Sequence, residues 1–337
     1  GEGTEELRDR ATEIIVDLEL DSATRINARL HHNLYSSAST DRIDARVSSA
    51  SAKDNRFAVS VGVEKDVRPE KTISVGGGIS SESDYQSLHV RGGFARRTDD
   101  QRTCWAVTGS AFFDRWVPFL PVELRDRADS LIAQTRRYTY DIALGIRHDL
   151  NPRLVLRVDG GLTVQHGLLS TPFHRAYRSD GTMDLERLPS VRLRVPVSVR
   201  LSYFPVHVLT INLRQRVYGD SWGVVASTSE IELPVHLHRT LVVRGSYRVH
   251  AQRAARAFAP FMGHDLQARY LTSDLDLSGF VSQQFSGGLS WRPVKGYRKD
   301  VADHPRALRE IGLNGFYYVR SDGLRAFGVG GMVHFTL

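Results

Sequence analysis

The feature that most constrains the fold of this sequence is a two-residue alternation of apolar and polar side chains that persists over long segments. Residues 191–201 read VRLRVPVSVRL, so one face of an extended strand carries only Val and Leu. The other face carries three arginines, a serine and a proline. A strand of a globular protein averages about 5–6 residues, whereas a tilted strand that crosses a bilayer needs about 9–11. The alternation therefore predicts a membrane-spanning strand.

The same alternation recurs along the chain, in 154–164, 209–217, 231–237, 241–249 and 327–337. Together with the turn signals it predicts sixteen strands: 12–20, 24–35, 42–49, 56–65, 71–80, 84–96, 102–113, 137–148, 153–165, 190–203, 206–218, 222–235, 240–250, 277–292, 309–319 and 325–337. Lipid cannot satisfy the backbone groups of an open sheet edge. We therefore expect an all-β, closed, antiparallel transmembrane β-barrel of about 16 strands, within a range of about 14–18. A soluble β-sandwich is the alternative fold, and it would not need detergent.

The connections between these strands differ in length. Short turns such as VRPE (67–70) and RSDG (320–323) contrast with four long connections near 114–136, 166–189, 251–276 and 293–308. An even strand count with both termini inside places the first three long connections on one side, as expected for long extracellular loops and short periplasmic turns. The fourth would then be a long periplasmic segment.

The domain organisation that we expect is simple. The sequence has no run of about 20 apolar residues that could form a spanning helix. Residues 1–11 (GEGTEELRDRA) are charged and are expected to form an N-terminal periplasmic segment. Residues 12–337 are expected to form a single barrel in the bacterial outer membrane, in contact with the bilayer and with lipopolysaccharide. The mean hydropathy of −0.29 is compatible with this, because only one face of a barrel wall meets lipid.

Several local stretches resemble an uncharacterised family of predicted bacterial outer-membrane β-barrels, the domain of unknown function thirty-five-seventy. They are SSASTDRIDARVSSAS (36–51), SSESDYQS (80–87), GLLSTPF (167–173), VYGDSWG (217–223), YRVHAQRAA (247–255) and TSDLDLS (272–278). The resemblance implies an outer-membrane barrel and no established activity. Genes of this family often neighbour those of a small lipoprotein, a thioredoxin-like protein and a flavin transferase. The resemblance thus implies a lipoprotein or other envelope subunits as partners, in a redox-linked assembly.

The charge of the chain suggests what the barrel interior does. Of 45 basic residues only five are lysine, so 40 are arginine, and the net charge is +7. Eight of these arginines fall on the predicted lumen face of consecutive strands: Arg157, Arg192, Arg194, Arg200, Arg214, Arg216, Arg244 and Arg248. A ring of guanidinium groups in a water-filled pore favours anions. The pattern predicts a channel or export conduit with an arginine-rich lumen.

The alternative is that these arginines pair with inward acids such as Asp141, Asp159, Glu230 and Glu232 and fill the lumen. The chain would then be a plugged structural barrel that anchors a multi-subunit envelope complex. Arginine-rich composition also follows from a genome rich in G and C, and the sequence leaves these readings open.

Other chemistry receives little support from the sequence. His236 and His238 share a strand face, but no third ligand is set by spacing, so we expect no metal site and no cofactor. An outer-membrane hydrolase built on His166, Ser170, His174 and Asp180 is a minor alternative, and we expect no enzyme. The arginines are spread through alternating strands rather than along a surface stripe, so no nucleic-acid partner is expected. Cys104 is the only cysteine, which excludes an internal disulfide.

Overall fold

The strands of this protein form one large antiparallel sheet in which nearly every strand pairs with its neighbours in the chain. The computed structural model describes residues 5–39, 54–117, 135–171, 174–293 and 307–336. Its fifteen sheet strands are β1 (Glu5–Glu19), β2 (Thr24–Ser39), β3 (Asp54–Arg68), β4 (Lys71–Ser81), β5 (Tyr85–Arg97), β6 (Thr103–Trp116), β7 (Arg136–Asn151), β8 (Leu154–Gly167), β11 (Val191–Val206), β12 (Leu209–Asp220), β13 (Val225–His238), β14 (Leu241–Arg253), β15 (Phe280–Trp291), β16 (Ala307–Arg320) and β17 (Arg325–Thr336).

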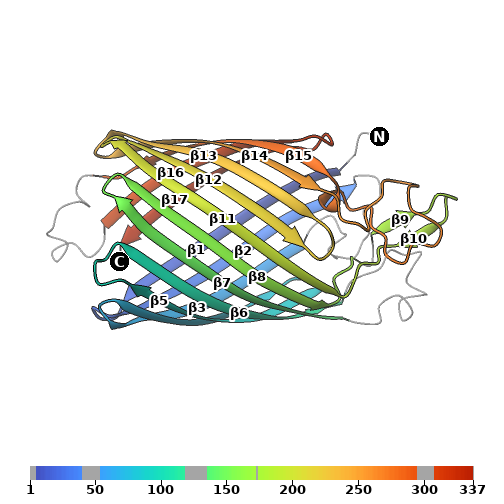
Figure 1. Ribbon diagram of the computed structural model, residues 1–337, viewed down its shortest axis with the longest axis horizontal. Coiled ribbons are helices and arrows are strands. Elements are labelled where there is room, and N and C mark those ends of the chain that lie inside the picture. The colour runs from blue at the N-terminus through green and yellow to red at the C-terminus, as the bar shows by residue number, and fades with distance from the viewer. Residues whose placement is uncertain (1–4, 40–53, 118–134, 172–173, 294–306, 337) are drawn as a thin grey trace.

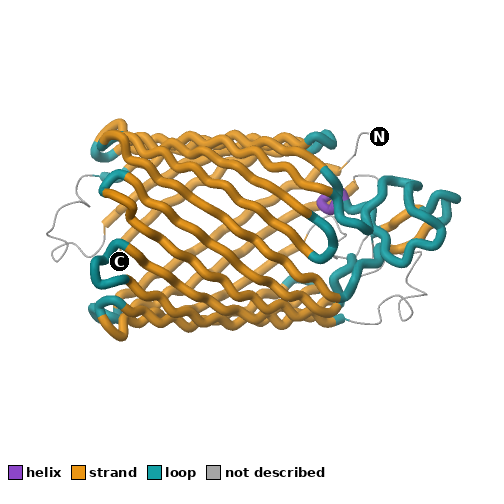
Figure 2. Tube along the Cα trace, in the orientation of Figure 1, coloured by secondary structure: helices purple, strands orange, loops and turns teal. Residues whose placement is uncertain are grey.

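The sheet curls into a cylinder around a long axis (Figure 1). β8 pairs directly with β11, because a small hairpin of β9 (Arg175–Tyr177) and β10 (Met183–Leu185) is inserted between them and forms its own two-stranded sheet. The end of the cylinder that carries the connections 168–190 and 254–279 is called the loop end here, and the opposite end is called the turn end (Figure 2).

The fourteen sheet strands from β2 onward each overlap a predicted strand closely, and β1 overlaps the predicted strand 12–20. The predicted strand 42–49 lies outside the described residues. β1 begins at Glu5, so part of the expected N-terminal segment is in the sheet, where its backbone pairs with the end of β2 (Glu5↔Ser39). Backbone pairing needs no apolar side chain, and a strand can therefore continue past the apolar stretch that revealed it.

The expectation that both ends of the described chain lie on one side is wrong. Fifteen antiparallel strands are an odd number, so β1 and β17 run in the same direction. The start of β1 therefore lies at the loop end and the last residues of β17 lie at the turn end (Figure 1). The end of β15 and the start of β16 lie at the turn end, opposite the connections 168–190 and 254–279, which agrees with the side predicted for the fourth long connection.

The two faces of the sheet differ in chemistry because the register aligns the alternation of every strand. On β11, the outer face carries Val191, Leu193, Val195, Val197 and Val199, which are all exposed. Arg200, on the inner face, lies directly opposite Arg157 of β8 and Arg214 of β12. An outer surface of this kind is stable only where water is absent.

The buried apolar side chains gather near the loop end instead of beneath the sheet. They include Ala176, Leu185, Leu188, Trp222, Val224, Ala255 and Leu271. They are contributed mainly by the connection 168–190, the β12–β13 turn and the connection 254–279. The first and last of these connections pack together into a lobe at this end, called the loop lobe below (Figure 2). Within the described part of the chain, no helix has the length and apolar character needed to cross a membrane.

Candidate functional site: the basic inner face

All eight arginines singled out from the sequence lie on the inner face of the sheet. The register shows this, because Arg157, Arg200 and Arg214 are consecutive partners across β8, β11 and β12. Arg216 lies opposite Ser198, and Arg248 lies opposite Glu230. Arg192, Arg194 and Arg244 share this face by the two-residue period of their strands.

Five of the eight arginines pair with acids of the same face. The pairs are Arg157–Asp159 at 2.9 Å, Arg192–Asp220 at 2.5 Å, Arg200–Glu232 at 4.0 Å, Arg244–Glu232 at 3.9 Å and Arg248–Glu230 at 2.8 Å. Glu232 thus lies between two arginines. Of the four inward acids that the sequence indicated, Asp141 differs from Asp159, Glu230 and Glu232, because it accepts a hydrogen bond from the Thr163 hydroxyl at 2.5 Å.

The remaining three arginines are different. Within the described residues, Arg194, Arg214 and Arg216 have no carboxylate within 4.0 Å. Arg194 donates a hydrogen bond to the Tyr218 hydroxyl at 3.1 Å and lies 5.6 Å from the centre of that ring. These three side chains leave a local excess of positive charge on adjacent strands β11 and β12.

The three unpaired arginines line one cavity of about 450 Å³. Its wall also contains the paired residues Glu230 and Arg248 and a set of neutral hydrogen-bonding side chains, namely Tyr218, Thr228, His250, Gln252, Ser282, Gln284 and Tyr318. Because Glu230 and Arg248 cancel, the wall keeps the charge of three guanidinium groups. Such a lining can bind anions through charge and through paired N–H donors.

Arg194 also reaches a second inner cavity, of about 440 Å³, on the other side of the cylinder's interior. Residues of β2 to β8 line this cavity, among them Arg29, His89, Phe112 and Arg137. Its arginines pair with acids, as in Arg29–Glu13 at 3.3 Å and Arg137–Asp114 at 3.1 Å. Arg194 is therefore the residue that both cavities share.

Glycine in β4 allows close packing of the wall next to this second cavity. The sequence places Gly76, Gly77 and Gly78 inside a strand, where glycine suggests curvature or close packing. A Cβ atom at Gly78 would lie 2.4 Å from the carbonyl oxygen of Val59 and 2.6 Å from the ring of His89. The absent side chain thus lets the neighbouring strand and the imidazole approach.

A buried carboxylate organises the wall next to the loop end. The Asp220 side chain is fully buried and accepts hydrogen bonds from Arg192, from the Tyr218 hydroxyl at 2.8 Å, and from the backbone N–H groups of Trp222 and Val224, both at 3.0 Å. The Arg192 guanidinium lies 4.2 Å from the centre of the Trp222 ring. This network joins the inner arginine face to the β12–β13 turn.

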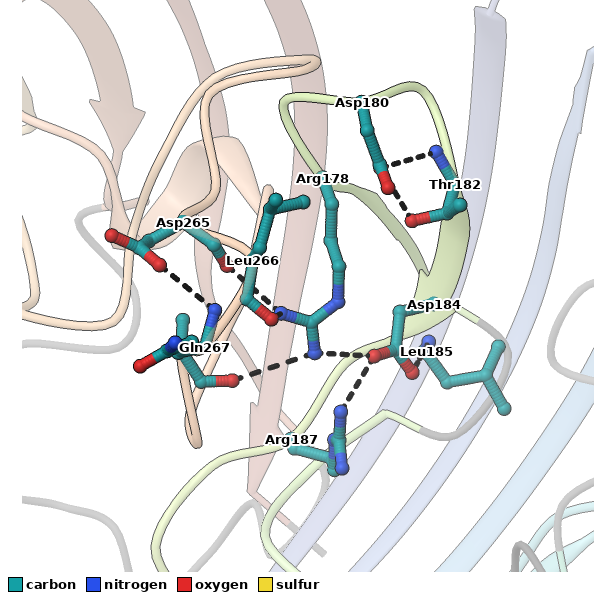
Figure 3. Close-up of polar contacts among 10 residues, drawn as sticks. Arg178, Asp180, Thr182, Asp184, Leu185, Arg187, Asp265, Leu266 and Gln267 are labelled. Carbon is teal, nitrogen blue, oxygen red and sulfur yellow. Dashed lines mark hydrogen bonds and ion pairs between the residues drawn. The ribbon is translucent and has the colours of Figure 1, made fainter.

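One arginine makes several of the contacts that join the two connections of the loop lobe. Arg178, just after β9, donates hydrogen bonds to the carbonyl oxygens of Asp265 at 2.8 Å and Leu266 at 2.7 Å (Figure 3). The same guanidinium pairs with Asp184 at 2.8 Å, and Asp184 also pairs with Arg187 at 2.5 Å (Figure 3). Although burial alone would raise the pKa of Asp184, the hydrogen bond from Arg178 and the neighbouring charges hold it below its usual range.

A second polar cluster in the lobe, not predicted from sequence, contains His174, Glu186 and Asp274. Their ligand-type atoms lie within 4.8 Å of one another. Glu186 is almost fully buried and accepts hydrogen bonds from the Thr171 N–H at 2.6 Å and the Thr272 hydroxyl at 2.5 Å. Burial raises the pKa of Asp274. The cluster thus joins the two connections of the lobe through hydrogen bonds of its own residues.

The residues of the minor hydrolase hypothesis have separate environments. His166 is at the end of β8 and stacks with Tyr138, with ring centres 6.5 Å apart. The Ser170 hydroxyl accepts the Leu188 N–H at 2.8 Å. Asp180 accepts the hydroxyl and N–H of Thr182. His174 lies 3.8 Å from Glu186 instead. His238, which was considered as a metal ligand together with His236, contacts the Thr240 hydroxyl at 2.9 Å.

The stretches that carried the family resemblance converge at the loop end. Stretch 217–223 contains Asp220 and Trp222, and stretch 272–278 contains Thr272 and Asp274, which lie in the networks just described. Stretches 80–87, 167–173 and 247–255 also reach this end of the sheet where they are described. The sequence alone assigns these residues no role, because their partners lie far apart in the chain.

An antiparallel sheet of fifteen strands with an apolar outer face, a basic inner face and long connections at one end defines an outer-membrane, porin-like β-barrel protein of Gram-negative bacteria. Within that class, the chain belongs to the family described as "Protein of unknown function (DUF3570)", whose model matches residues 35–293. No curated protein matches the sequence.

Solved structures with a similar chain trace are distant in sequence. The siderophore receptor PirA from Pseudomonas aeruginosa has 12% identity and a TM-score of 0.49, over 98% of this chain and 59% of the receptor. The outer membrane protein opdK from Pseudomonas aeruginosa has 9% identity and a TM-score of 0.47, over 98% and 92%. A BenF-like porin from Pseudomonas fluorescens Pf-5 has 8% identity and a TM-score of 0.43, over 92% and 78%.

Proposed function

We propose that the sheet closes into a barrel with a water-filled lumen that conducts anions across the outer membrane, and that Arg194, Arg214 and Arg216 select them. The observation that carries this proposal is that the three arginines line one cavity and that, in the part of the chain that the structure describes, none of them has a carboxylate within 4.0 Å. Five neighbouring arginines of the same face are paired, so the excess charge is local.

The physical basis is the electric field of the three guanidinium groups at the cavity wall. Like charges held on adjacent strands repel one another, and a bound anion relieves this repulsion. Each guanidinium also offers N–H donors in a plane that fits carboxylate and phosphate oxygens. The neutral side chains around the cavity, such as Thr228, Ser282 and Gln284, can replace part of the hydration shell. The substrates that fit this lining are small anions or the charged groups of an acidic polymer.

The test is single-channel recording in a planar bilayer under a salt gradient. The triple variant Arg194→Gln/Arg214→Gln/Arg216→Gln should move the reversal potential from the anion side toward zero. The matched control is Arg157→Gln/Asp159→Asn, which removes an inner-face ion pair and leaves the net charge unchanged. It should keep the anion preference. An unaltered reversal potential in the triple variant would overturn the assignment of the filter.

Closure of the barrel is part of the proposal and has its own test. β1 and β17 are the two ends of the sheet and run in the same direction, so direct pairing would form a parallel ladder. An open edge in lipid would leave a row of backbone groups unsatisfied. In a Cys104→Ser background, Ile14→Cys combined in turn with Val329→Cys, Gly331→Cys and Val333→Cys should give an intramolecular disulfide in one of these pairs. No crosslink in any pair would contradict direct closure.

The second candidate is a structural barrel whose lumen is filled, which anchors envelope subunits such as a lipoprotein in a redox-linked complex. The five arginine–carboxylate pairs of the inner face favour it, because paired charges suit a filled interior. The loop lobe would then be a site for a partner. Correctly folded protein that gives no current, and that purifies with a stoichiometric subunit from native membranes, would favour this function over the conduit.

A further inference from the structure

The outer face of the sheet carries a polar patch where lipid is expected. Gln215 of β12, Ser227 and Ser229 of β13, and Gln283 of β15 are exposed on this face. Gln215, Ser229, Val249 and Gln283 are consecutive partners across four strands, so they form one row across the wall. Away from the strand ends, the other outward positions of β11 to β17 are aliphatic, aromatic or glycine.

At Gln215 the patch lies within the apolar surface, whereas Ser227 and Gln283 lie near the loop-end starts of β13 and β15. Gln215 lies opposite Val199, whose strand carries Val191, Leu193, Val195 and Val197 toward the loop end and Leu201 and Tyr203 toward the turn end. On its own strand Gln215 lies between the outward residues Leu213 and Val217. A row of four strands is about 14 Å wide at a spacing of about 4.8 Å. The patch is therefore a polar area of appreciable width that extends from the middle of the apolar surface on β12 to near its loop-end edge on β15.

Hydrogen bonds within the patch satisfy only part of it. The Gln215 amide donates to the Ser227 hydroxyl at 2.8 Å and accepts from Ser229 at 2.5 Å. The Gln283 carbonyl accepts from the Tyr247 hydroxyl at 3.1 Å. Within the described residues, the two N–H donors of Gln283 have no acceptor. Lipid tails offer none, and N–H donors without an acceptor in hydrocarbon are unfavourable.

Small residues flank the patch without an internal reason. A Cβ atom at Gly219, Gly245 or Gly287 would meet nothing within 4 Å. These outward glycines are therefore not required by packing within the chain, and they leave room for another surface. On the loop-end side of the patch is a depression of about 650 Å³, lined by Val217, Ser227, Ala251, Gly279 and Val281 among others. Small residues of this kind allow protein backbones to approach closely within a membrane.

We infer that this patch on β12 to β15 is an interface between two copies of the chain in the membrane. The patch is uncharged and contains both amide donors and oxygen acceptors, so it complements itself. A two-fold interface brings the same surface of both subunits together. It would bring the unpaired donors of Gln283 close to the oxygens of the partner's patch and place the glycines and the depression against protein. A lipid can fill the depression but cannot accept hydrogen bonds along the row.

The first experiment is site-directed crosslinking in native outer membranes with a Cys104→Ser background. Three single-cysteine variants along the row, Ser229→Cys, Val249→Cys and Gln283→Cys, place the thiol at different distances from the two-fold axis. At least one of them should form a disulfide-linked dimer on oxidation, visible as a band of twice 37.8 kDa on a non-reducing gel. The matched control is Ile142→Cys on β7, which is outward and 61% exposed but lies on another part of the wall. It should remain monomeric. Crosslinking of these variants to a different protein, or no crosslink in any of the three, would overturn the inference.

The second experiment keeps the inference testable if the cysteine variants fold poorly. Native mass spectrometry in mild detergent should detect a dimer of the unmodified protein. The variant Gln215→Leu/Ser229→Ala/Gln283→Leu should weaken its association by about tenfold or more, since polar contacts between membrane segments contribute modestly each. If the patch faces lipid, the unmodified protein is monomeric and the more apolar variant is the more heat-stable one. That result would also overturn the inference. Neither experiment depends on whether the lumen conducts.

Discussion

Arg178 pairs with Asp184 while its other guanidinium nitrogen bonds the carbonyl oxygens of a segment 87 and 88 residues away in sequence. One largely buried side chain therefore links the β9–β10 hairpin to the connection 254–279 (Figure 3). Hydrogen bonds from a charged donor contribute about 1.5–3 kcal/mol each. The lobe should accordingly be more sensitive to this residue than to any exposed ion pair near it.

Replacement of Arg178 by methionine should loosen the loop lobe without unfolding the barrel. The expected cost is about 2–4 kcal/mol of local stability, because two carbonyl contacts and one ion pair are lost. Limited proteolysis should then cut within 254–279 at least tenfold faster, while the unheated protein keeps its folded mobility on a gel. The matched control is Arg187→Met, which removes a half-exposed partner of the same Asp184. Equal cleavage of both variants would show that the carbonyl contacts do not hold the lobe.

Acid pH should loosen the same lobe. The pKa of Asp184 in the folded protein lies below its usual value of 3.8, so its ionised form stabilises the folded lobe. This contribution is present above pH about 4 and is lost as the pH falls through the lowered pKa. Amide exchange in 174–187, corrected for the intrinsic effect of pH, should therefore increase between pH 5 and about 2.5.

Two variants separate Asp184 from its neighbours in this experiment. Asp184→Asn should exchange faster than the unmodified protein at neutral pH and lose most of the acid-induced increase. Asp180→Asn removes the contacts to Thr182 within the hairpin turn but no contact between the two connections, so the increase should persist. Burial raises the pKa of Asp274. Protonation of Asp274 therefore favours the folded lobe, so this residue cannot produce loosening in acid. An unchanged acid response in Asp184→Asn would contradict the assignment.

The Asp220 carboxylate should be the most sensitive single group of the loop-end wall. Asp220→Asn leaves the Arg192 guanidinium without a counter-charge beside Trp222, and breaking a buried ion pair costs about 3–5 kcal/mol. The midpoint of urea unfolding should fall clearly. The control Asp322→Asn affects a similar turn, but there Arg320 keeps its pair with Asp276 at 2.6 Å. A smaller loss is expected for it, and equal losses would contradict a special role of Asp220.

The strands were predictable because each one faces two different media. A residue on the outer face meets lipid and a residue on the inner face meets a polar interior. The alternation from Val191 to Leu201 therefore predicts both the strand and the face on which each side chain lies. Strand β1 is longer than predicted because charged residues can extend a ladder by backbone pairing alone. The faces of all eight arginines followed from the same period.

The contacts of the site were less predictable, because the two-residue period of a strand tells which face a side chain lies on but not which residue it pairs with. Arg214 and Arg248 are both inward, yet Arg248 pairs with Glu230 at 2.8 Å while Arg214 does not. The register and rotamers of neighbouring strands decide this. The loop lobe has no periodic pattern, and the contact between Arg178 and Asp265 joins segments that no local rule relates. The polar patch around Gln215 is visible as a break in the alternation only once the outer face is known.

The assignment of outer and inner faces makes a final prediction for β7. Ile142 is outward and 61% exposed, whereas Thr139 lines the second inner cavity. An arginine on the lipid-facing side of a barrel costs about 2–4 kcal/mol near the bilayer midplane, but an arginine in a polar lumen stays hydrated. Ile142→Arg should therefore lower the unfolding midpoint of the lipid-reconstituted protein much more than Thr139→Arg. Both variants add one positive charge, so overall charge is controlled. If Thr139→Arg were the more destabilising of the two, the inner face would be closely packed rather than wet, and the filled barrel would become the better account of this protein.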